Sequence, residues 1–188
     1  MSTEHPNPDP AATDEPLASF SQCHAGITRQ LAQLAALPPL LEPAVQARRI
    51  ARDTVAFFRG AVHEHHAEEE QELFPAVLAS ATRGPEREQV QVMVERLMAE
   101  HRLIEAMWAR LEPGLKAVGK GLDAEVDAAA VQRLVDTYGG HARYEEQEFL
   151  PLSQTILGRN GNHMAALGLS MHMRHSVPAM LERYGHII

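Results

Sequence analysis

The sequence predicts an all-α protein: an up-down bundle of four helices, with a disordered N-terminal tail and an extra C-terminal helix. Good helix formers such as Ala, Leu, Glu, Gln, Arg and Met dominate the 188 residues, and aromatic residues make up only 5%. Apolar residues recur at helical intervals, and no long alternating run of β-branched residues occurs. A chain of this length is expected to form one domain of ordinary size with its own core.

Proline, glycine and composition set the expected boundaries. The tail is predicted because residues before Leu17 include four prolines and almost no large apolar side chain. The tail, the bundle and the C-terminal helical extension are predicted at residues 1–16, 17–158 and 159–188. The four bundle helices are predicted at residues 17–37, 43–80, 85–111 and 123–157.

Individual residues mark the ends of these helices. The first helix should stop before the pair Pro38 and Pro39, and the second should start near Pro43, because proline is accepted only in the first turn. Asp123 is a plausible N-cap for the fourth helix. A kink or break is expected at Pro75 and is repeated at Pro151.

An eleven-residue block occurs twice, as HHAEEEQELFP at residues 65–75 and HARYEEQEFLP at residues 141–151, with six identical positions. In each copy the first His is followed four residues later by a Glu, so the two side chains share one face of a helix. Both pairs interrupt an apolar stripe, where an ionised carboxylate is costly unless something compensates it. A metal ion bound by imidazole and carboxylate would do so.

The duplication extends to the helix before each block. His24 precedes His65 by 41 residues, and His101 precedes His141 by 40. Each pair of helices therefore supplies one His from its first helix and a His with a Glu from its second. This register predicts a metal site. The alternative is a set of buried histidines and carboxylates that satisfy each other by hydrogen bonds.

This layout resembles the hemerythrin-like, or HHE cation-binding, family of non-haem di-iron four-helix bundles, over residues 17–157. The resemblance implies a bundle of hemerythrin type with a di-iron centre, oxo- or hydroxo-bridged, in which Zn or Mn can substitute for Fe. It also implies which residues bind the metals. These are His24, His65, His101 and His141 as terminal ligands, and Glu69 and Glu145 as carboxylates able to bridge two irons.

Two positions depart from the oxygen-carrying members of that family. Glu105 stands where they have a second His on the third helix, and Glu145 follows His141 by four residues where they use a five-residue step to Asp. Harder oxygen donors favour the ferric state, which argues against durable reversible oxygen carriage. A solvated acid on the helix surface is the alternative interpretation of Glu105.

Other residues give competing hypotheses. His66 with Glu70 is a second register on the second helix, about 100° round from the first, and His66 also fits a role in orienting a ligand. Tyr138 is interpreted as a core residue or as a hydrogen-bond donor to a ligand. The C-terminal histidines interleaved with methionine are interpreted as a covering helix, with a soft-metal site as the alternative. They are His163, His172 and His175.

The expected function is binding or sensing of a small oxidant or diatomic ligand: O2, NO or peroxide. Whether the protein is also an enzyme stays open, with binding favoured. A stress-response enzyme that reduces peroxide or NO, or repairs iron-sulfur clusters, is one alternative, although the cysteine-bearing N-terminal segment of repair proteins has no counterpart before Cys23. A regulatory interaction module with a structural metal is the other.

Composition excludes several classes. The net charge of -8 argues against a nucleic-acid partner. The sequence has no apolar run long enough for a membrane span and no secretory signal, so a cytoplasmic location is expected. Cys23 is the only cysteine, which excludes an intramolecular disulfide and a thiolate metal site. The oligomeric state stays open, a homodimer included.

Overall fold

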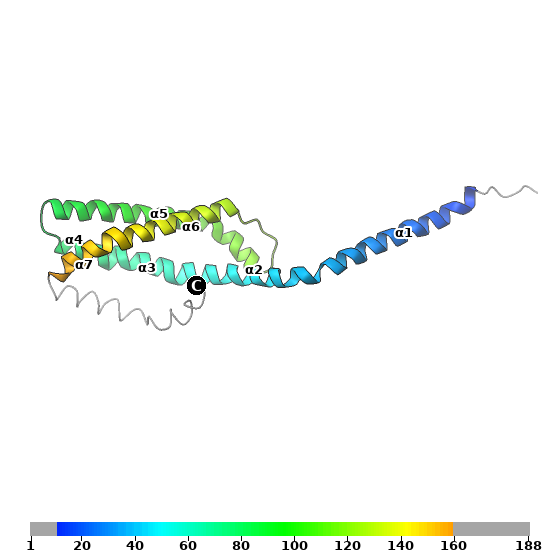
Figure 1. The fold of residues 1–188 in the computed structure, drawn as a ribbon, viewed down its shortest axis with the longest axis horizontal. Coiled ribbons are helices and arrows are strands. Elements are labelled where there is room, and N and C mark those ends of the chain that lie inside the picture. The colour runs from blue at the N-terminus through cyan, green and yellow to red at the C-terminus, as the bar shows by residue number, and fades with distance from the viewer. Residues whose placement is uncertain (1–10, 160–188) are drawn as a thin grey trace, which may run out of the picture. The chain divides into compact units, whose positions relative to one another are not determined.

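The structure of the chain, a computed structural model, describes residues 11–159, which are helical nearly throughout and contain no strand (Figure 1). This confirms the predicted all-α fold. The described residues form four long helical stretches, and the chain divides into two compact units that meet between Arg49 and Ile50. None of the described helices is both long and apolar enough to cross a membrane. Most of the predicted tail and the predicted C-terminal helix lie outside the described residues.

The first unit contains α1 (Ala11–Ala36) and the start of α2 (Pro38–Phe57). α1 begins within the segment predicted as a tail and ends before the proline pair, as predicted. The prediction that the next helix starts at Pro43 is wrong, because α2 begins at Pro38 and Pro43 lies inside it. Pro38 and Pro39 occupy the first turn, where a missing N–H leaves no helical hydrogen bond unmade.

The second unit contains the rest of α2 and three helical stretches that pack against one another (Figure 1). The first of these continues α2 without interruption to Ser80, where the second bundle helix was predicted to end. The elements after α2 are η1 (Phe58–Val62), α3 (His63–Glu68), η2 (Glu69–Leu73), α4 (Phe74–Ser80), α5 (Pro85–Gly119), α6 (Ala128–Tyr144), η3 (Glu145–Phe149) and α7 (Leu150–Gly158).

The two repeated blocks share a local distortion, because η2 and η3 are π-helical turns at matching positions. In η2 the N–H of Phe74 donates to the carbonyl of Glu69, five residues back, and in η3 Leu150 donates to Glu145 in the same way. The residue after each donor is a proline, which has no N–H to donate. The helix therefore widens ahead of each proline and continues, so the kink or break expected at Pro75 and Pro151 is a π-helical turn and not a break.

α5 runs eight residues beyond its predicted end at Leu111 and includes Pro113. Contacts on both sides of this proline hold the last turns. The Nε of Arg59 donates to Glu112 at 2.9 Å. The helix end also packs closely on Arg52, since a Cβ added at Gly119 would lie 2.9 Å from its Cγ atom. These contacts offset the one backbone hydrogen bond that proline removes.

α6 begins later than predicted, because its N-cap is Asp127 and not Asp123. The Asp127 carboxylate accepts a hydrogen bond from the N–H of Ala129 at 2.8 Å. Gly140 lies within α6 without being required by close packing, since a Cβ added there would meet nothing within 4 Å.

Two apolar clusters form the core of the second unit, and a layer of polar residues separates them along each helix. On α5, for example, His101 lies between Leu97 of one cluster and Ile104 of the other. The first cluster is centred on Leu73, Phe74, Val77, Val90, Leu97, Phe149, Ile156 and Leu157. The second is centred on Ile104, Trp108, Leu111 and Leu134, with Phe58 stacked on Trp108. Trp108 is buried in this cluster.

Candidate metal centre

The polar layer contains five buried titratable side chains, an unusual content for a protein interior. Three are histidines and two are glutamates, and they come from all three helical stretches of the second unit. They are His66, Glu69, His101, His141 and Glu145. Glu69 and Glu145 are the first residues of the π-helical turns η2 and η3, so the distortion of each repeated block coincides with its buried carboxylate.

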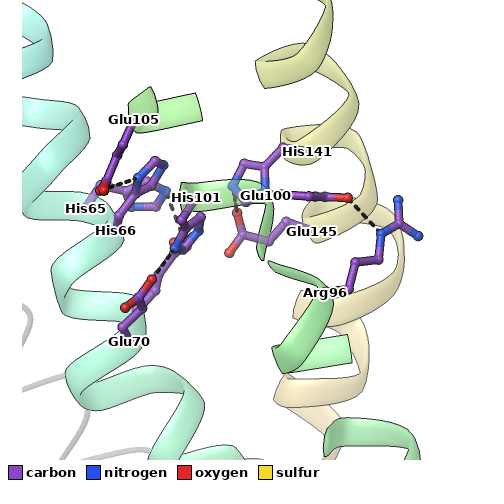
Figure 2. Close-up of polar contacts among 10 residues, drawn as sticks. His65, His66, Glu70, Arg96, Glu100, His101, Glu105, His141 and Glu145 are labelled. Carbon is purple, nitrogen blue, oxygen red and sulfur yellow. Dashed lines mark hydrogen bonds and ion pairs between the residues drawn. The ribbon is translucent and has the colours of Figure 1, made fainter. Parts of the chain in front are cut away.

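The three histidines form one group of close nitrogen atoms. A ring nitrogen from each of His66, His101 and His141 lies within 4.8 Å of the other two. The rings of His66 and His101 are stacked with centroids 3.9 Å apart, and His141 meets His101 edge-on at 4.9 Å. α3, α5 and α6 each contribute one of these rings (Figure 2).

A second group adjoins the first and contains the two carboxylates. His65, Glu69 and Glu145 each offer a ligand atom within 4.8 Å of the other two. His65 Nε2 lies 3.2 Å from one oxygen of Glu69. The other oxygen of Glu69 lies 3.3 Å from His101 Nε2, without the alignment of a hydrogen bond. The two groups therefore meet at Glu69.

Carboxylates on neighbouring helices face the outer nitrogens of the same histidines (Figure 2). Glu70 on η2 lies 2.9 Å from Nδ1 of His101, and Glu100 on α5 lies 3.1 Å from Nδ1 of His141. A carboxylate accepts hydrogen bonds, so each pair fixes the proton on Nδ1 and leaves Nε2 as a lone-pair donor. That is the tautomer that a histidine needs to bind a metal through Nε2.

Burial keeps two of the three imidazoles neutral. Burial, followed by the repulsion of a protonated His101, lowers the pKa of His66 to about 3. Burial also lowers the pKa of His141, although Glu100 acts in the opposite direction. For His101, burial is outweighed by the carboxylates of Glu69 and Glu70, which raise its pKa. At neutral pH the lone pairs of His66 and His141 are therefore available to a cation.

The two buried carboxyl groups share one proton. Burial raises the pKa of Glu145, and the neighbouring charge of Glu69 raises it further. Burial also works against ionisation of Glu69, but its contacts with His101 and Glu145 outweigh that effect and lower its pKa. The proton therefore resides on Glu145 and offsets the repulsion between the two groups. A bound cation would replace it.

Polar atoms without a partner converge at this point. In the described part of the chain, no hydrogen bond reaches six of the buried atoms in the two groups, and a buried polar atom without a partner costs about 1–3 kcal/mol. These atoms are Nδ1 and Nε2 of His66, Nε2 of His101 and His141, Oε2 of Glu69 and Oε1 of Glu145. Imidazole nitrogen and carboxylate oxygen are both ligands of divalent transition metals. The residues present therefore fit a cation.

Comparison with known proteins supports the same conclusion. Residues 15–153 match the model of the hemerythrin HHE cation-binding domain. The chain belongs to this family. An uncharacterized protein of Haemophilus influenzae is 27% identical over 163 residues, which span 83% of this chain and 91% of that protein. No solved structure matches the chain.

The structure brings together most of the ligands predicted for this HHE domain. Glu69, His101, His141 and Glu145 are buried and converge. His65 contacts Glu69, but its side chain is 48% exposed. His24 lies on α1 in the first unit, where its side chain is exposed. Its role as a ligand stays a prediction.

His66 was predicted only as a competing register or as a residue that orients a ligand, but it is buried within the layer. Spacing alone could not choose between the two registers, because His65 and His66 follow the buried Val62 by three and four residues, and both steps are helical. The useful signal lies on the third helix, where His101 and Glu105 are four residues apart and share a face. Glu105 is 44% exposed, with Oε1 3.6 Å from Nδ1 of His66.

Tyr138 packs against the second core cluster, as one of its two interpretations predicted.

Proposed function

We propose that this HHE domain holds a non-haem di-iron centre, and that the centre binds or senses a small oxidant or diatomic ligand: O2, NO or peroxide. The observation that carries the proposal is the convergence of partnerless nitrogen and oxygen atoms in a buried layer. Two adjoining donor groups that meet at Glu69 support a pair of cations over a single one. A carboxylate shared by two cations screens their mutual repulsion.

Each residue has a proposed part in holding the metals. Glu69 lies 3.3 Å from Nε2 of His101 and Glu145 lies 3.9 Å from Nε2 of His141, so each carboxylate adjoins both donor groups, and His101 and His141 would supply terminal nitrogens. His65 serves the more exposed side of the centre. His24 stays the sixth ligand that the sequence predicts, since its separation from His65 is within one residue of that between His101 and His141. Iron, when bound, supplies open coordination positions at which a small molecule can bind.

The surroundings of the layer support a small ligand. The apolar clusters on either side close over it, with Phe74 and Phe149 on one side and Ile104 on the other. A cavity of about 640 Å³ in the second unit is lined by residues such as Leu111, Gly114 and Val126, and by none of the site residues.

The test is the absorption spectrum of the iron-loaded full chain, with the Fe2+ form prepared without oxygen and exposed separately to NO, O2 and peroxide, and the oxidised Fe3+ form exposed to azide. The expected result is a new charge-transfer band with azide and a spectral change with at least one of the other three. Bound iron with a spectrum that none of them changes would contradict the ligand-binding proposal and support a structural metal. Sustained turnover of peroxide or NO would replace binding by an enzymatic function.

A further inference from the structure

His66 is the one buried residue of the polar layer that lies outside the repeated His and Glu pattern. Its position in the second copy of the block is taken by Ala142. Its side chain is only 2% exposed, and neither ring nitrogen has a hydrogen-bond partner in the described residues. An imidazole buried in this way is destabilising unless its nitrogens bind something. The repeated pattern does not explain why a histidine is buried at position 66.

The orientation of the rings points to a ligand common to all three histidines. The outer nitrogens of His101 and His141 are held by Glu70 and Glu100, and that of His66 faces Glu105 at 3.6 Å. The contacts of His101 and His141 place a proton on Nδ1 and leave Nε2 as a lone-pair donor, whereas no hydrogen bond fixes the tautomer of His66. The Nε2 atoms of all three rings are buried and without a partner. Carboxylate contacts of this kind are typical of histidines that bind metals.

We propose that His66, His101 and His141 form a three-histidine cation site, which adjoins the His65, Glu69 and Glu145 group but differs from it in chemistry. This inference rests on the proposed function, because both groups would belong to one metal centre. It adds His66 as a ligand and makes the two cations unequal. The group of three imidazoles favours Zn2+, Co2+ or Fe2+, whereas the group with two carboxylates also suits harder ions such as Mn2+.

Because the two sites differ, we expect them to bind cations in a fixed order. The three rings of the three-histidine site are at most 2% exposed, whereas one ligand of the other group, His65, is 48% exposed. The three-histidine site is therefore the more enclosed of the two. The first equivalent of a borderline cation is therefore expected at the three histidines, and the second at the carboxylate group.

The experiment is a titration of the metal-free full chain with Co2+, followed by visible absorption, for the wild type and three single variants. His66→Ala should weaken the first equivalent by about 100-fold or more, at the upper end of what losing a supporting residue costs. His65→Ala should keep the first equivalent and its spectrum and weaken only the second. Glu64→Ala is the control from the same helix, since Glu64 is exposed and belongs to neither group. It should behave as wild type.

The outcomes distinguish a failure of the three-histidine site from a failure of the di-metal centre. If His66→Ala binds both equivalents with an unchanged spectrum while His65→Ala loses the first, the three-histidine site is wrong and the di-metal centre stands. If the wild type binds neither Co2+ nor Fe2+, both proposals fail.

A measurement on the wild type covers the case in which His66→Ala does not fold. In protein labelled with 15N at histidine, the first equivalent of Zn2+ should shift the Nε2 resonance of His66 together with those of His101 and His141. A His66 resonance that stays in place while the other two shift would overturn the proposal. The same spectra report which nitrogen of each ring carries the proton.

Discussion

The two copies of the repeated block have the same backbone but different surroundings. Both contain a π-helical turn that begins at a buried Glu and ends just before a proline. The leading histidines differ, because the side chain of His141 is 1% exposed and that of His65 is 48% exposed. The sequence of a block thus determines its local helix geometry, while the neighbouring helix determines which of its side chains are enclosed.

The second Glu of each block differs in the same way. Glu70 reaches Nδ1 of His101 on α5, whereas its equivalent, Glu146, is exposed. The helices around the first block therefore use Glu70 to orient a histidine, and the second block obtains the same support from Glu100 on α5. Substitutions at equivalent positions can test this comparison directly.

The largest effect is expected for the carboxylates that the two blocks share. Glu69→Ala or Glu145→Ala removes an atom that reaches both donor groups, so either variant should lose the paired-metal spectrum. Metal analysis with absorption spectroscopy on iron-loaded protein measures this. Glu146→Ala is the control and should retain the spectrum. Equal loss in all three variants would show that the assignment of buried carboxylates is wrong.

The next effect distinguishes the second glutamates. Glu70→Ala removes the carboxylate that fixes the tautomer of His101 and should weaken metal binding by about 10–100-fold. At saturating metal its spectrum should be largely retained, because Glu70 is not a proposed ligand. Glu146→Ala should change the affinity little. Competition with a coloured chelator measures both constants, and equal affinities in the two variants would remove the positioning role of Glu70.

A smaller effect concerns the stability of the metal-free protein. The pKa of Glu145 is higher in the folded chain than in the unfolded chain, so the folded state keeps a proton that the unfolded state releases. Its contribution to stability is therefore present below about pH 4.5 and is lost as the pH rises through neutrality. Glu145→Gln should stabilise the metal-free protein at pH 8 by about 1–2 kcal/mol, and by less at pH 5. Urea unfolding at the two pH values measures this, and a variant less stable at pH 8 would contradict it.

The smallest effect lies outside the second block. Arg96 donates to one oxygen of Glu100 at 2.8 Å and lies over the ring of Tyr144 at 3.5 Å. Because this ion pair is half exposed, Arg96→Ala should loosen Glu100 only slightly and weaken metal binding by up to about fivefold. The same chelator competition detects it, with Arg102→Ala, an exposed arginine on the same helix, as control. A loss as large as that of Glu70→Ala would show that Arg96 does more than support Glu100.

Local signals predicted much of the fold. The helix ends at Pro38 and Gly84–Pro85 followed from proline and glycine, whose constraints act within one turn. Pro113 misled the prediction because its cost is offset by contacts with residues far along the chain, such as Arg59. Asp123 and Asp127 are equally good caps by residue type, and only the packed helix selects the second.

The metal site, like the fold, was predictable only where the signal lies within one helix. Repetition identified Glu69, Glu145, His101 and His141, because both copies place them on core-facing stripes. It could not rank His65 against His66, since adjacent residues on a helix differ by about 100° and the choice depends on where α5 lies. The supporting carboxylates Glu70 and Glu100 act across helices, so no spacing within one helix predicts them.

We propose that two cations occupy the buried layer between the core clusters. Crystals of the iron-loaded full chain, measured at the iron absorption edge, test this most directly through anomalous difference density. Two peaks are expected, one at His66, His101 and His141 and one at His65, Glu69 and Glu145. Density confined to the protein surface, with these side chains bonded only to one another, would contradict it.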